Sequence, residues 1–178
     1  MAQYSRRRLD EFLQRSNNAT TSHEKGKALE DLICYIFEKV PGMSVSFKNE
    51  TNYAQTEEID IGFWNESYNS RGFHYFPALV LVECKNWSRP VDTQNVAYFI
   101  QKLQNRGRDY GIIVATNGIT GSRERNDGAY YEISMALSRR LHILILSYEE
   151  IENLNTTQDL VNLFKEKLCE LAMTTTTF

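Results

Sequence analysis

The sequence has few cysteines and no long apolar run. Only three cysteines occur in 178 residues, they are far apart, and no Cys-x-x-Cys pair is present. This pattern argues against a disulfide framework and against a structural zinc site. No stretch approaches the roughly 18 consecutive apolar residues of a membrane span. The N-terminal segment MAQYSRRRLDEF carries positive charge but no apolar segment, so it does not read as a secretory signal. These absences predict a cytoplasmic protein.

Internal repeats, a Walker-type glycine-rich loop and a Gly-x-Ser-x-Gly motif are also missing from the sequence. The composition, 42% hydrophobic and 24% charged, is ordinary for a globular protein, and the length predicts one domain over residues 1–178.

Charge is low overall and unevenly distributed. The net charge is −3, which argues mildly against a protein that only coats nucleic acid. Residues 85–140, however, hold nine Lys or Arg against five Asp or Glu, whereas residues 148–172 hold two against six. A basic middle segment that faces phosphates and a pair of ordinary solvated faces are both consistent with this pattern.

Hydrophobic periodicity predicts alternating strands and helices from residue 78 onward, which favours an α/β sandwich around a mixed sheet. Residues 65–77 are rich in turn-forming residues and predict a loop. Helices are expected at 5–16, 22–40, 92–105, 127–139 and 156–172, and strands at 43–49, 57–64, 78–85, 110–116 and 142–146.

One predicted strand, LVLVECK, is apolar and then ends in Glu83, Cys84 and Lys85. Side chains alternate along a strand, so Glu83 and Lys85 share a face and Cys84 points away, which disfavours a cysteine nucleophile. Burial of two charges costs several kcal/mol per ion, by rough estimate, unless each is paired or coordinated. The alternating strand EEIDIGFW offers Asp60 on its polar face as a partner.

Asp60, Glu83 and the carbonyl of Cys84 are hard oxygen donors of the kind that Mg²⁺ binds. A bound divalent ion would lower the pKa of a water molecule, and Lys85 would orient that water or stabilise charge on a phosphate oxygen. Glu30 lies on the line of Ile33 and Phe37 at helical spacing, so it leans toward the packed side of its helix. It either joins the metal site or pairs with Lys27.

The order EEID, then ECK, resembles the D…(D/E)-x-K motif of the PD-(D/E)xK nuclease superfamily, and most closely its Mrr-like restriction endonuclease catalytic domains. GKALEDLICYIF with Glu30 resembles the early helix of that branch. After the Glu-x-Lys strand, that branch has a helix, a strand and a later helix–strand pair. The matching segments here are, in that order, VDTQNVAYFIQKL, YGIIVATNGITG and ALSRRLHILIL. The resemblance implies a three-layer restriction-endonuclease-like fold, with a nuclease core at about 22–152 and the helices at 5–16 and 156–172 appended.

By this resemblance Asp60 and Glu83 are metal ligands, Lys85 is the catalytic lysine and Glu30 is an accessory acid and a further candidate ligand. The implied activity is Mg²⁺-dependent (or Mn²⁺-dependent) hydrolysis of DNA phosphodiesters, in defence against foreign DNA or in repair. No recognition domain is evident, so a homodimer or a separate targeting subunit is expected. The sequence departs from the motif at Ile59, which replaces a proline, and in the 23-residue gap from Asp60 to Glu83. If the strands do not pair, Glu58 replaces Asp60.

Several further residues are candidates for nucleic-acid contact, each with an ordinary surface role as the alternative: Gln94, Arg106, Arg108, Arg123 and Arg125. Trp87 either stacks on a base or packs at the edge of the core. Two other functions stay open: a non-catalytic nucleic-acid-binding or assembly module that keeps the fold, and an unrelated enzyme in which Glu83 and Lys85 form a structural ion pair.

Overall fold

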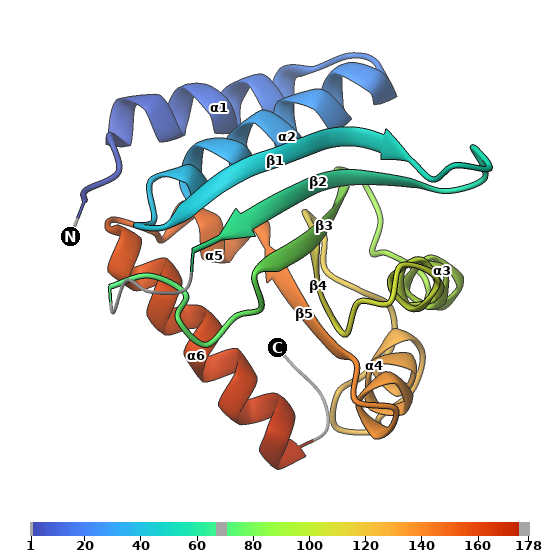
Figure 1. Cartoon of the computed structure of the whole chain (residues 1–178). Helices are drawn as coiled ribbons and strands as arrows, with labels where there is room; N and C mark the ends of the chain where they lie inside the picture. Colours follow the sequence, from blue (N-terminus) through green and yellow to red (C-terminus); the bar gives the residue numbers. More distant parts are fainter. Residues whose placement is uncertain (1, 67–70, 175–178) are drawn as a thin grey trace.

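The computed structural model describes residues 2–66 and 71–174 and contains a mixed sheet flanked by helices (Figure 1). The strands are β1 (Met43–Thr51), β2 (Glu58–Asn65), β3 (Leu79–Lys85), β4 (Tyr110–Ala115) and β5 (His142–Ser147). The helices are α1 (Arg6–Asn18), α2 (Ser22–Glu38), α3 (Thr93–Asn105), α4 (Ala129–Ser138), α5 (Tyr148–Glu152) and α6 (Thr157–Thr174). The predicted α/β architecture is confirmed.

The five strands lie in the sheet in the same order as in the chain. β1 pairs with β2 and β2 with β3 in antiparallel fashion, whereas β3, β4 and β5 are parallel. Ile61 lies opposite Val82, so the start of β2 lies beside the end of β3. The predicted loop after β2 therefore does return the chain into pairing, although its residues 67–70 lie outside the described residues.

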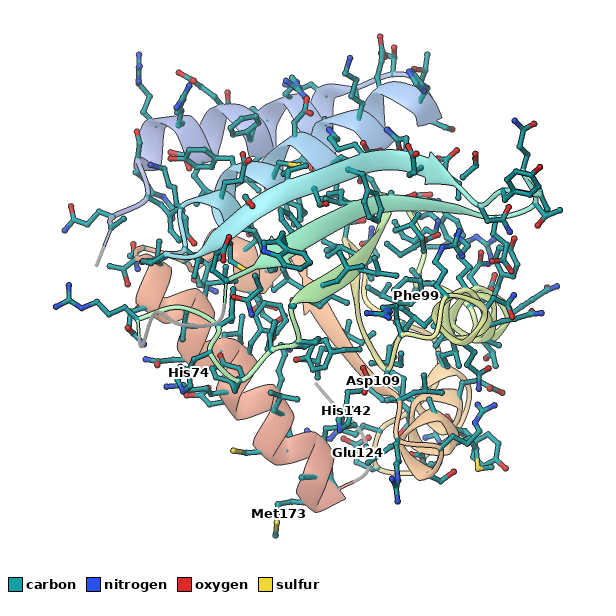
Figure 2. All side chains as sticks on the ribbon, in the orientation of Figure 1. His74, Phe99, Asp109, Glu124, His142 and Met173 are labelled. Carbon is teal, nitrogen blue, oxygen red and sulfur yellow. The ribbon has the colours of Figure 1, made fainter. Side chains whose placement is uncertain are left out.

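Helices cover both faces of this sheet (Figure 1). On one face, Phe37 of α2 stacks on Phe63 of β2 at 4.9 Å and contacts Phe164 of α6 at 5.8 Å between ring centroids. On the other face, α3 and α4 lie side by side, and Phe99 of α3 is buried against the sheet (Figures 1 and 2). No helix among residues 2–66 and 71–174 has the length and apolar character needed to cross a membrane.

Local sequence explains where α2 begins and ends. Thr21 and Glu24 form a capping box, in which each side chain accepts a hydrogen bond from the other residue's backbone N–H. The apolar stripe that predicts the helix is fully buried, and the helix ends at Glu38, shortly before Pro41-Gly42. This helix carries Glu30 toward the sheet.

Some predicted boundaries were wrong by a few residues. β1 extends to Thr51 rather than 49, because Glu50 and Thr51 still pair with Ile59 and Glu58 at the start of β2. α4 begins at Ala129 rather than 127, because Gly128 adopts a φ of 60°.

Candidate active site

Asp60 and Glu83 meet where the start of β2 pairs with the end of β3. The Cys84 N–H donates a hydrogen bond to Asp60 Oδ2 over 2.6 Å. Asp60 Oδ1 accepts no hydrogen bond from any part of the chain that the structure describes, and Asp60 lines a cleft of about 610 Å³. The predicted pairing of these two strands is confirmed, so the condition under which Glu58 would replace Asp60 is not met, and Glu58 lines the same cleft.

The Glu83 side chain is buried and paired with two lysines. Its Oε1 lies 2.8 Å from Lys85 Nζ and 2.8 Å from Lys102 Nζ, and its Oε2 lies 3.0 Å from Lys102 Nζ. The first contact confirms that Glu83 and Lys85 share a face. Lys85 is partly exposed and lines the cleft, whereas Glu83 lies beneath it.

Lys102 was missed in the sequence, although a signal was present. It lies on α3 three residues after Phe99 and one before Leu103, which places it on the buried side of that helix. A cation on an apolar face needs an anion, and here Glu83 supplies both of its oxygens. Lys102 also lies 5.0 Å from the ring centroid of Tyr98.

Burial and neighbouring charges shift the pKa values of several groups in the site. Burial and the negative charge of Glu83 raise the pKa of Asp60 to about 6. Burial by itself would lower the pKa of Lys85, but the charge of Glu83 and its hydrogen bond outweigh that effect and raise it. Burial raises the pKa of the Cys84 thiol well above its usual range, so this thiol stays protonated near neutral pH.

Glu30 reaches the same cleft from α2. Its Oε2 accepts a hydrogen bond from Asn49 Nδ2 at 3.1 Å and lies 3.5 Å from Lys48 Nζ, both on β1. The inward lean predicted for Glu30 is confirmed, and its partners are Asn49 and Lys48 rather than Lys27.

Trp87 closes the cleft on the side of β3. It is half-buried against the core, which is the packing that the sequence offered as the alternative to base stacking. Its ring lies 5.7 Å from Lys85 Nζ and 5.4 Å from Arg89 Cζ, distances at which a cation is attracted to the ring face.

The donor set at the cleft fits a hard divalent cation. Asp60 and Cys84 line the cleft, a carboxylate and a backbone carbonyl are hard donors, and the buried Glu83 is bonded to Lys85 of the same cleft. Within the described ranges, however, no three His, Cys, Asp or Glu side chains form a metal-binding group. Asp60 and Glu83 are the two acids that would hold such an ion.

The arginines predicted to contact nucleic acid are placed in different surroundings. Arg106 is held by Glu57, with Nη1 2.7 Å from Oε2 and Nη2 2.9 Å from the backbone oxygen. Arg123 is half-buried and bonded to Glu170 of α6. Arg108 and Arg125 are exposed, and Arg125 pairs with Asp127 at 2.7 Å.

Gln94 does not line the cleft that contains Asp60. It is exposed and shares a separate surface hollow with Asn95, Ala97, Tyr98 and Gln101. The placement of Gln94 at the start of α3 is as predicted, but the helix turns it away from the two acids.

The fold and the site together define a class of protein. A mixed five-stranded sheet with flanking helices brings an Asp from one strand to the Glu-x-Lys end of the next, the arrangement of restriction-endonuclease-like proteins. The Mrr_cat family, described as restriction endonuclease, matches residues 22–138, and the chain belongs to this family. The match includes Glu30, Asp60, Glu83, Lys85 and Lys102. No curated protein matches the chain.

Proposed function

We propose that the protein is a divalent-metal-dependent endonuclease that hydrolyses DNA phosphodiester bonds. The observation that carries the proposal is the meeting of Asp60, Cys84 and Lys85 at one cleft, with the buried Glu83 carboxylate bonded to Lys85. Membership of a restriction endonuclease family supports the same activity.

The residues of the cleft have distinct roles in this proposal. Asp60, Glu83 and the Cys84 carbonyl hold Mg²⁺ or Mn²⁺, and a bound ion would supply a water of lowered pKa and neutralise charge on the phosphate. Lys85 stabilises the negative charge that develops on the phosphate oxygens. Glu30 acts as an accessory acid of the same cleft, where Asn49 and Lys48 hold its carboxylate.

The biological setting that fits this activity is restriction of foreign DNA in the cytoplasm. Target choice would come from a second copy of the chain or from a separate targeting subunit, and the exposed Arg108 and Arg125 are candidates for phosphate contact.

A second candidate function is a nucleic-acid-binding module without catalysis. The specific observation that favours it is that lysines already engage both oxygens of Glu83, so that this carboxylate is not free to bind an ion in the structure described.

A plasmid assay separates the two functions. Supercoiled DNA is incubated with the protein and Mg²⁺ or Mn²⁺, with and without EDTA. Nicking that requires the metal and that Lys85→Ala abolishes would support the nuclease. Lys165→Ala, an exposed lysine of α6, is the matched control and should cut normally. DNA binding that survives chelation, with no nicking at any metal concentration, would instead favour the module.

A further inference from the structure

Lys102 is a buried cation that the proposed hydrolysis does not use. Its side chain is 6% exposed, and its Nζ bonds both oxygens of a carboxylate that is itself 5% exposed. A bidentate contact of this kind fixes the orientation of Glu83 as well as neutralising it. Lys85 cannot replace it, because Lys85 reaches Oε1 alone and also faces the cleft.

The charges at this place balance without any added ion. Two acidic side chains, Asp60 and Glu83, lie beside two lysines, Lys85 and Lys102. A divalent cation that enters gains attraction from two carboxylates but meets repulsion from two ammonium groups in a partly buried setting, where such forces are weakly screened. To reach the cation, Glu83 must also release or share at least one lysine contact.

Nucleic acid changes this balance because each phosphodiester brings a negative charge to the cleft. The cation then finds net negative charge, and Lys85 gains a second anion to bind. Binding of the cation and of the backbone would therefore be coupled, and the coupling is reciprocal for two ligands that favour the same site.

We infer that Lys102 is a positioning residue that holds Glu83 and keeps the affinity of the free protein for divalent cations low, so that the metal binds together with nucleic acid. This inference rests on the proposed nuclease function. A purely structural role, in which Lys102 only ties α3 to β3, predicts no gain in metal affinity when Lys102 is replaced.

The test measures Mn²⁺ binding directly, from the electron paramagnetic resonance signal of the free ion, in the absence of DNA. Lys102→Met should tighten Mn²⁺ binding by about tenfold or more, because one positive charge leaves the site. Lys102→Gln should act in the same direction and serves if the methionine variant does not fold. Lys102→Arg, which keeps the charge, should stay close to the wild type.

The chain offers a matched control for burial and charge. Lys167 is 2% exposed and pairs with Glu150, away from the cleft. Lys167→Met removes the same charge from a similarly buried lysine, and it should leave Mn²⁺ affinity unchanged even if it lowers the melting temperature.

A phosphorothioate-substituted duplex, which keeps the backbone charge and resists hydrolysis, completes the measurement. The duplex should tighten Mn²⁺ binding by the wild type about tenfold or more, and by Lys102→Met clearly less. Equal or weaker Mn²⁺ affinity in both neutral variants would overturn the role of Lys102, and metal-dependent plasmid cutting by the wild type would then still support the nuclease. Failure of the wild type to bind Mn²⁺ with or without duplex, together with no cutting, would overturn both.

Discussion

The Cys84 backbone N–H lies 2.6 Å from Asp60 Oδ2, and this hydrogen bond holds a carboxylate that its surroundings disfavour. Burial and the nearby charge of Glu83 raise the pKa of Asp60 from 3.8 to about 6, whereas the hydrogen bond from Cys84 acts in the opposite direction. The site thus keeps an acid in a place where its charged form is disfavoured, a cost that a bound cation would relieve.

The raised pKa of Asp60 predicts how stability depends on pH in the metal-free protein. Between about pH 4 and pH 6 the folded state keeps a proton that the unfolded state has lost, so the free energy of unfolding falls as pH rises through this window. Above about pH 6 Asp60 is charged in both states, and the folded state carries the full free-energy cost of that buried charge. Asp60→Asn keeps an acceptor for Cys84 and removes the penalty, so it should stabilise the protein by about 1–3 kcal/mol at pH 8.

Thermal melts in EDTA at pH 4 and pH 8 measure this effect. The gain in Asp60→Asn should be present at pH 8 and absent at pH 4. Asp109→Asn, a substitution at an exposed position, is the control and should change the melting temperature little at either pH. An Asp60→Asn variant that is less stable than the wild type at pH 8 would contradict the assigned strain.

Gly62 lies on β2, the strand that carries Asp60, and the ring of Phe47 leaves no room for a side chain there. A Cβ at this position would lie 2.2 Å from Phe47 Cζ on β1. Gly62→Ala should therefore lower the free energy of unfolding by about 1–3 kcal/mol, because the Phe47 ring must move. Denaturant titration measures this loss, and combination with Phe47→Leu should recover much of it.

Gly26 on α2 is the matched control for that substitution. A Cβ there meets nothing within 4 Å, and a glycine inside a helix is unfavourable relative to alanine. Gly26→Ala should stabilise the protein by about 0.5–1 kcal/mol. If the two substitutions changed the free energy of unfolding equally, backbone propensity and not contact with Phe47 would decide the result at Gly62.

Arg106 and Glu57 form a clamp between α3 and the start of β2, and Asn105 Nδ2 adds a hydrogen bond of 2.6 Å to Glu57 Oε1. Arg106→Gln leaves a buried carboxylate poorly compensated, so it should lower the free energy of unfolding by about 2–4 kcal/mol. Arg108→Gln, at an exposed position, should change stability by less than about 0.5 kcal/mol.

DNA-binding measurements at several salt concentrations test the same two arginines for phosphate contact. If Arg108 binds a phosphate, its replacement should reduce the slope of log affinity against log salt by about one. Arg106→Gln, compared at a temperature where it is folded, should leave that slope unchanged. A reduced slope in Arg106→Gln would show that the clamp opens toward DNA.

The sequence was sufficient to predict the strands of the sheet and the position of several candidate site residues, because each signal is local. The alternation in EEIDIGFW predicts that Asp60 lies on the other face of its strand from Ile59 and Ile61. The apolar run before Glu83 predicts a strand that is covered on both faces. The helical stripe that places Glu30 on the packed side of α2 is local in the same way.

Other features depend on contacts between distant segments, and these could not be predicted from a single sequence. Lys102 binds Glu83 across 19 positions, and Arg106 binds Glu57 across 49, so neither partner follows from periodicity. From the sequence, Arg106 in its basic segment is a candidate for phosphate contact. The packing of α3 instead pairs it with the carboxylate of Glu57. The direction in which the Gln94 side chain points from α3 likewise depends on how that helix packs.

Glu30 of α2 lines the same cleft as Lys85 of β3. Glu30→Gln keeps the contact with Asn49 but removes the charge, so it should reduce plasmid cutting by about 10- to 100-fold, as loss of a supporting group at a metal site typically does. Stability should change little, because Lys48 retains its 2.9 Å contact with Asp31. Glu38→Gln, on the same helix but outside the cleft, is the matched control. Undiminished cutting by Glu30→Gln would show that the carboxylate only positions β1 against α2.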